Sequence, residues 1–164
     1  MKHQMADSLT LDRTDLRLLA LLQQDGRATN ADIAGQVNLS PSACLRRIQR
    51  LEATGVIQGY AATVDPKRVG LGLQAFVRVQ LEKHGQLGLD RFIEGVNSWD
   101  EVVACHALTG DMDYLLQVVV QDLEHFSRFL LDKLINATGV ADVNSSFVLR
   151  TVKQTRALPL GHLG

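Results

Sequence analysis

The chain has 164 residues, a formal net charge of −1 at pH 7 and 46% hydrophobic residues. This length suits one ordinary domain or two small ones, and the apolar content excludes wholesale disorder. No apolar run reaches the ~18–20 residues of a membrane span, and the N-terminus lacks the apolar segment of a secretory signal. We therefore expect a cytoplasmic protein with no membrane partner, in which Cys44 and Cys105 are reduced thiols.

The N-terminal third of the sequence predicts three helices. The first covers residues 11–26, where leucines form a broad apolar face, and the second is a short helix within residues 29–40. The third covers residues 40–55 and has the clearest signals. Ser40 is a suitable N-cap, and Pro41 stands at the first helical position, where its missing N–H costs nothing.

The short turn between the second and third helices is typical of a helix-turn-helix, whose third helix enters the major groove of DNA. Cys44, Ile48 and Leu51 repeat at helical spacing and would occupy the inner side of this helix. Its outer side would then bring short side chains and arginines to bases and phosphates. The expected DNA-binding residues are Ser40, Ser42, Ala43, Arg46, Arg47 and Arg50. The alternative is a solvent-facing, arginine-bearing helix of a small bundle.

The period of the apolar residues becomes alternating after Gly72. Two predicted helices then separate four predicted strands in the βαββαβ order of a ferredoxin-like fold. In the second of these helices the expected inward residues are Leu123, Phe126, Leu130 and Leu134. The last strand is expected at residues 140–149, and residues 150–160 could add a fifth extended piece.

We therefore predict an α+β protein with two domains. Residues 1–64 would form a winged helix-turn-helix domain, with residues 56–65 as one arm of the wing. Residues 65–72 would be a linker, and residues 73–164 would form the ferredoxin-like domain.

Asp111 and Asp113 stand two residues apart in "TGDMD", a predicted turn between two strands. Paired carboxylates of hydrolases usually lie on different elements, and a calcium loop needs more oxygen ligands than follow Asp113. Two interpretations stay open. The aspartates shape the turn, or one of them binds the ammonium group of an amino acid while turn N–H groups hold its carboxylate. Histidine spacing predicts no metal site, and the sequence has no catalytic or nucleotide-binding motif, so we expect no enzyme activity, catalytic residue or cofactor.

Three segments in this order resemble the Lrp/AsnC family of feast/famine transcription regulators. They are residues 11–27, 39–62 and 108–120. The resemblance implies a sequence-specific regulator that binds double-stranded DNA and responds to a small amino-acid effector, for which we expect leucine or methionine. It also implies homodimers formed through the C-terminal sheets and further assembly, often to a homo-octamer. The alternatives are an architectural DNA-binding protein without an effector and an enzyme or ligand-binding module on the second half.

The resemblance further implies where the effector binds, at contacts between dimers. Family members use a glycine–aspartate loop and a segment of the last strand. In the loop, the matching residues are Thr109, Gly110, Asp111, Met112, Asp113 and Tyr114. On the strand, they are Ser145, Ser146, Phe147 and Val148.

Overall fold

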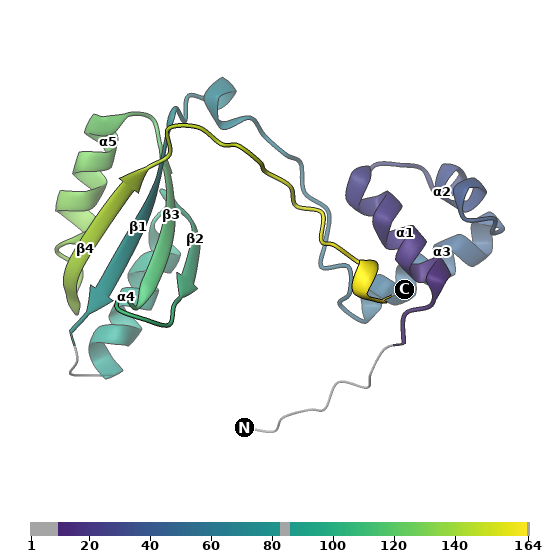
Figure 1. Cartoon of the computed structure of the whole chain (residues 1–164), viewed down its shortest axis with the longest axis horizontal. Coiled ribbons are helices and arrows are strands. Elements are labelled where there is room, and N and C mark those ends of the chain that lie inside the picture. The colour runs from purple at the N-terminus through teal and green to yellow at the C-terminus, as the bar shows by residue number, and fades with distance from the viewer. Residues whose placement is uncertain (1–9, 83–85, 164) are drawn as a thin grey trace. The chain divides into compact units, whose positions relative to one another are not determined.

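The structure is a computed structural model that describes residues 10–82 and 86–163 (Figure 1). The chain divides into two compact units. Of the described residues, the first holds 10–63 and 153–163, and the second holds 64–82 and 86–152. Among the described residues, no helix is long and apolar enough to span a membrane.

Three helices build the first unit: α1 (Arg13–Gln24), α2 (Asn30–Gln36) and α3 (Pro41–Ala53). Each begins at a side chain that accepts a hydrogen bond from a first-turn N–H: Asp12 for α1, Thr29 for α2 and Ser40 for α3. The three helices share one apolar core, formed by Leu18, Ile33, Ala34, Val37, Cys44 and Ile48. The three predicted helices are confirmed, as is Ser40 as the N-cap of the third.

The segment after α3 forms no strand over residues 56–65, so the expected arm of a wing lacks a paired β-structure. The segment is held instead by Ile57 N–H, which donates to Leu51 O, and by the Tyr60 hydroxyl, which donates to Glu52. No described strand pairs with this segment, so its backbone groups have no ladder partners and it stays irregular.

The C-terminal segment, residues 153–163, groups with the first unit, whereas the sequence placed it in the second domain. Leu158 N–H donates to the Gln23 side chain of α1, and Gln23 Nε2 donates back to Leu158 O at 3.3 Å. Residues 150–160 form no strand, so the expected fifth extended piece does not join the sheet.

The second unit is a four-stranded antiparallel sheet in the order β2-β3-β1-β4. Its strands are β1 (Leu73–Leu81), β2 (Val102–Ala107), β3 (Tyr114–Val120) and β4 (Val140–Phe147). Helices α4 (Gln86–Ser98) and α5 (Leu123–Arg128) pack on one face of the sheet (Figure 1). This is the predicted ferredoxin-like arrangement.

The helix that begins as α5 changes to a π-helical turn over Phe129–Leu134. Ile135 N–H donates to Leu130 O, five residues earlier, so residues five apart reach the same side. Phe129 and Leu134 are therefore buried, whereas Leu123, expected to face inward, is 59% exposed. The prediction of regular α-helical spacing is therefore wrong over this turn, and Leu123 does not face inward.

Candidate DNA-binding surface and effector site

The start of α3 is fixed by short-range hydrogen bonds. The Ser40 hydroxyl accepts from Ala43 N–H at 3.3 Å and lies 3.2 Å from the Ser42 hydroxyl. Asn30, the first residue of α2, donates from Nδ2 to Pro41 O at 2.8 Å and so holds the two helix starts together. These hydrogen bonds fix the N-terminus of α3 against the start of α2.

The six residues expected to contact DNA fall into two groups in the structure. Ser40, Ser42 and Arg46 are exposed, and Ala43 is half-buried beside them. Arg46 makes no ion pair with any described residue, so its guanidinium group is available to an anion.

Arg47 and Arg50 form ion pairs with α1, although Arg50 stays exposed, as Arg46 is, and Arg47 is half-buried. Arg47 Nη1 donates to Asp12 Oδ2 at 2.7 Å and to Asp15 Oδ1 at 2.9 Å. Arg50 Nη2 donates to Asp15 Oδ2. The reason is the carboxylate of Asp15, which is fully buried and needs charged donors to offset its lost hydration.

Asp12 and Asp15 also form a reciprocal capping box at the start of α1. Asp15 N–H donates to Asp12 Oδ1 at 2.8 Å, and Asp12 N–H donates to Asp15 Oδ2 at 3.1 Å. The hydrogen bond from Asp15 N–H and then the guanidinium of Arg47 hold the pKa of Asp12 below its usual value. The same contacts, first with Asp12 and then with Asp15, raise the pKa of Arg47.

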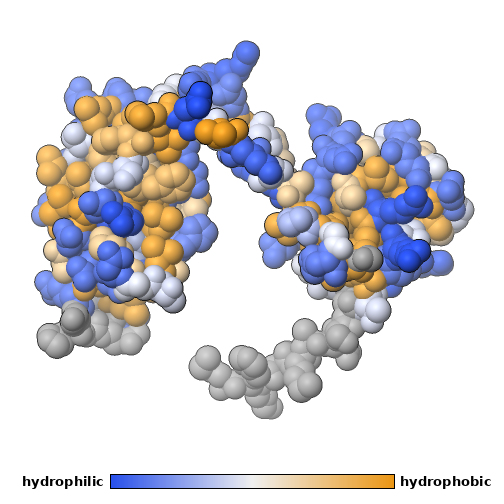
Figure 2. All heavy atoms as spheres, in the orientation of Figure 1, coloured by the Kyte–Doolittle hydropathy of each residue, from blue (hydrophilic) through white to orange (hydrophobic). Residues whose placement is uncertain are grey.

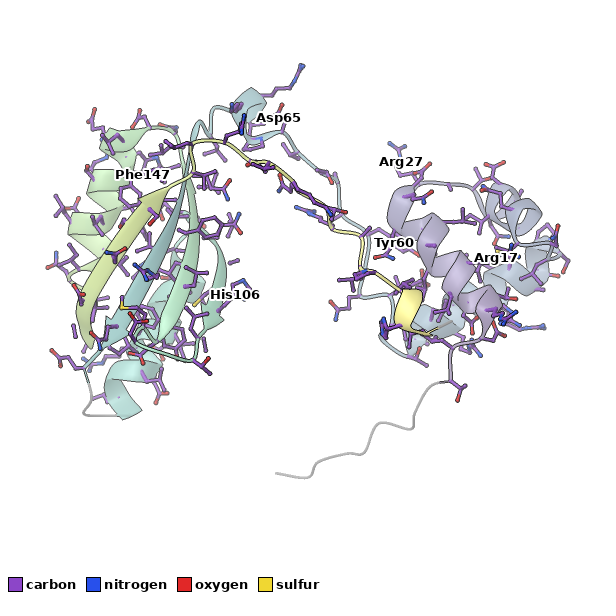
Figure 3. All side chains as sticks on the ribbon, viewed as in Figure 1. Arg17, Arg27, Tyr60, Asp65, His106 and Phe147 are labelled. Carbon is purple, nitrogen blue, oxygen red and sulfur yellow. The ribbon has the colours of Figure 1, made fainter. Side chains whose placement is uncertain are left out.

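The first unit carries further positive charge that the sequence interpretation did not include. Arg13 and Arg17, four residues apart on α1, are exposed and make no ion pair with the described residues. Figure 3 shows Arg17 on α1, and Figure 2 shows hydrophilic residues around this part of the unit. Their i, i+4 spacing on the polar side of a predicted helix was the signal that could have identified them.

The second unit has a hollow of about 700 Å³ where β1 ends and the β2–β3 turn begins. Four of the expected effector residues line it: Gly110, Asp111, Asp113 and Tyr114. Thr109 does not line it, and Met112 is buried in the turn. The other lining residues were not expected from the sequence: Gln80, Leu81, Glu82, Leu89, Ala107 and Leu108.

The two aspartates of this turn have different environments. Asp113 Oδ2 accepts from Leu81 N–H at 2.7 Å, and its backbone N–H donates to Val79 O, so it joins the turn to the end of β1. Asp111 is exposed and has no hydrogen-bond partner among the described residues. Its carboxylate therefore has free acceptor capacity in the hollow, as does that of Glu82, which is exposed and makes no side-chain hydrogen bond with a described residue.

The expected segment on the last strand lies far from this hollow within one chain. Tyr114 pairs with Val79, near the end of β1, whereas Phe147 pairs with Ala75, near its start. Phe147 packs against Phe126 of α5, with ring centroids 5.0 Å apart. Figure 3 shows Phe147 on β4 and His106 on β2, the two edge strands. Because β1 is antiparallel to both β3 and β4, the start of β3 and the end of β4 are at opposite ends of the sheet.

The described part of the chain contains no group of three or more His, Cys, Asp or Glu side chains that could hold a metal ion. Comparison with known proteins identifies both units. Residues 11–58 match the winged helix-turn-helix DNA-binding model, and residues 74–158 match the Lrp/AsnC ligand binding domain. The chain belongs to the Lrp/AsnC family.

Relatives in the Lrp/AsnC family match over nearly the whole length. The Bkd operon transcriptional regulator of Pseudomonas aeruginosa is 43% identical, over 92% of this chain and 98% of its own. The glutamate uptake regulatory protein of Zymomonas mobilis is 39% identical, over 92% of this chain and 91% of its own. A Neisseria meningitidis transcriptional regulator, solved as an L-Met complex, has a TM-score of 0.91 and 49% identity, covering 94% of this chain and 99% of that one.

Proposed function

We propose that this Lrp/AsnC family member is a sequence-specific DNA-binding transcription regulator whose affinity for DNA responds to a small amino acid. The observation that carries the proposal is the pairing of a rigid, arginine-bearing α3 in one unit with a polar hollow in the other. In a helix-turn-helix, the second of the two helices reads bases in the major groove while neighbouring cations contact phosphates.

On the DNA side, Ser42 and Arg46 of α3 are the proposed direct contacts, since both side chains are exposed. Ser40 and Ala43 lie at the helix start, where the backbone can approach a phosphate. Arg17 of α1 is proposed to add a phosphate contact. Arg47 and Arg50 lie on the same helix as Arg46. Their ion pairs with α1 support a different role for them.

On the effector side, the hollow is proposed to bind the ligand's ammonium group at Asp111, whose carboxylate is free. Leu81, Leu89 and Leu108 line the same hollow and would contact an aliphatic side chain. Leucine or methionine fits this combination, and the 49% identical Neisseria regulator was solved with L-Met. Ser145, Ser146, Phe147 and Val148 are proposed to reach an effector only across a contact between copies, because they lie away from the hollow of their own chain.

Assembly is proposed to follow the family pattern, with homodimers formed through the sheets and larger homo-oligomers formed from dimers. The sheet face opposite α4 and α5 supports this, because Phe76 on β1 is 38% exposed there. Removing the apolar surface of such a residue from water is favourable. Size measurement by light scattering, with and without amino acid, tests this part of the proposal.

The deciding experiment is a DNA-shift titration at graded salt, with and without each amino acid. We expect binding at low salt that changes with leucine or methionine. Absence of DNA binding at the lowest salt concentration would refute the proposed regulator function. Binding that ignores all twenty amino acids would identify an architectural DNA-binding protein instead. A thermal-shift screen against the same amino acids identifies the effector independently, because a ligand of the folded state raises its stability.

A further inference from the structure

The three arginines of α3 differ in what they contact, although all three were expected on one surface. Arg46 is exposed and makes no ion pair with a described residue. Arg47 bridges Asp12 and Asp15, and Arg50 binds the second oxygen of Asp15. Asp15 is fully buried, so these donors replace the water that its carboxylate has lost.

The charges in this cluster balance, since the two carboxylates of Asp12 and Asp15 face the two guanidinium groups of Arg47 and Arg50. An arginine that moved from this cluster to a DNA phosphate would leave a buried carboxylate with fewer partners, which proteins tolerate poorly. The cluster also joins the N-terminus of α1 to the middle and end of α3. It therefore sets how α3 is held in the unit.

We propose that Asp15 is a positioning residue for DNA recognition. It binds Arg47 and Arg50 against α1, which fixes the orientation of α3, and it leaves Arg46 as the arginine of that helix that contacts DNA. Every residue of α3 is described in the structure, so the comparison of its three arginines is complete. The inference rests on the proposed DNA binding and adds a division of roles within the recognition helix.

The salt dependence of binding to non-specific duplex DNA separates the roles. Each phosphate that a protein neutralises contributes roughly −0.9 to the slope of log K against log salt. Arg46→Gln should make this slope shallower by about 0.9 per DNA-bound helix. Arg47→Gln and Arg50→Gln should leave the slope unchanged, because their charges are already balanced by Asp12 and Asp15.

Asp15→Asn provides the complementary test, with Asp25→Asn as the matched control. Asp25 lies in the same unit, is exposed and contacts the backbone N–H of Arg27 rather than an arginine of α3. Asp15→Asn releases one arginine, so the non-specific slope should steepen by about 0.9 and the ratio of specific to non-specific affinity should fall about tenfold. Asp25→Asn removes the same charge and should change neither quantity by a comparable amount.

Two results would overturn the proposal. One is a loss of slope in Arg47→Gln or Arg50→Gln equal to that in Arg46→Gln, which would make them phosphate contacts. The other is an Asp15→Asn protein that folds and behaves as Asp25→Asn does. If circular dichroism shows that Asp15→Asn does not fold, the salt slopes of the three glutamine variants decide whether the roles are divided. Wild-type protein that binds no DNA would refute the proposed function itself, whereas equal slopes would refute the division of roles alone.

Discussion

Two pairs of aspartates, at the start of α1 and in the turn before β3, have similar spacing in the sequence and different environments in the fold. Asp12 and Asp15 are both occupied, by each other's backbone N–H and by arginines of α3. In the turn, Asp113 is occupied by Leu81 N–H, whereas Asp111 is exposed without a partner among the described residues. The availability of a carboxylate for a ligand therefore depends on the donors that the fold brings to it.

The largest expected effect comes from removing the buried member of the first pair. Asp15→Ala leaves Arg47 and Arg50 without their shared partner and should lower the free energy of unfolding by about 3–5 kcal/mol. Urea unfolding followed by far-UV circular dichroism measures this loss. Trp99 is the single tryptophan and lies in the second unit, against Phe92 and Phe129, so its fluorescence transition should not move.

Asp25→Asn, an exposed aspartate of the first unit, is the control for that measurement and should change the same free energy by about 0.5 kcal/mol or less. An Asp15→Ala protein as stable as this control would show that the carboxylate does not bind both arginines. A shift of the Trp99 transition would show that the units unfold together.

The exposed member of the first pair should have a smaller, pH-dependent effect. Asp12→Ala removes the N-cap of α1 and should cost about 1–2 kcal/mol at neutral pH. The pKa of Asp12 in the folded protein lies below its ordinary value of 3.8. Its contribution is therefore complete above pH 3.8 and is lost as the pH falls through the folded-state pKa.

Urea midpoints for wild type and Asp12→Ala, measured at pH 6, 4 and 3, test this dependence. The two proteins should differ at pH 6 and converge in the acid range. A constant difference across this range would mean that the cap acts through geometry without its charge.

Asp113→Ala should have a smaller effect, of about 1 kcal/mol, because it loses one hydrogen bond to the strand end at Leu81. Trp99 fluorescence in a urea titration reports this loss in the second unit. Asp113→Asn is the matched control, since its amide oxygen can still accept from Leu81 N–H, and it should recover most of the stability. Equal losses in both variants would mean that the charge, rather than the hydrogen bond, stabilises the turn.

Helix starts and strand order were predictable because their signals are local. Asp12, Thr29 and Ser40 cap helices through bonds to residues three positions later, which a sequence shows directly. The change from helical to alternating apolar spacing after Gly72 likewise predicted where the second unit's sheet begins. Such patterns need no knowledge of the tertiary structure.

The candidate sites were less predictable because they depend on distant contacts. The ion pairs of Arg47 and Arg50 with Asp15 join residues 32 and 35 positions apart. Asp15 precedes Leu18 and Leu19 by three and four residues, and that helical spacing was the available sign that it would be buried with them. The separation of Phe147 from the turn required the strand register, which no local pattern contains.

Substitution of Asp111 should cause the smallest change in stability but a large change in effector affinity. Asp111→Asn removes a charge from an exposed turn and should change the free energy of unfolding by about 0.5 kcal/mol or less. If this carboxylate binds the effector's ammonium group, the same variant loses a charge-assisted hydrogen bond of about 1.5–3 kcal/mol, so affinity should fall at least tenfold.

Isothermal titration calorimetry with L-methionine and L-leucine, on Asp111→Asn and Asp113→Asn side by side, measures this contrast. Glu82→Gln is the control, because Glu82 supplies another carboxylate to the same hollow. A tenfold loss confined to Asp111→Asn would assign the ammonium group to the free aspartate. The same loss in Glu82→Gln, with Asp111→Asn unchanged, would move that role to the end of β1 and reduce Asp111 to a residue of the turn. The hollow would then be the correct site, but Asp111 would be the wrong partner for the ammonium group. An exposed carboxylate that is hydrated by water gains little from binding a cation unless the ligand also excludes that water.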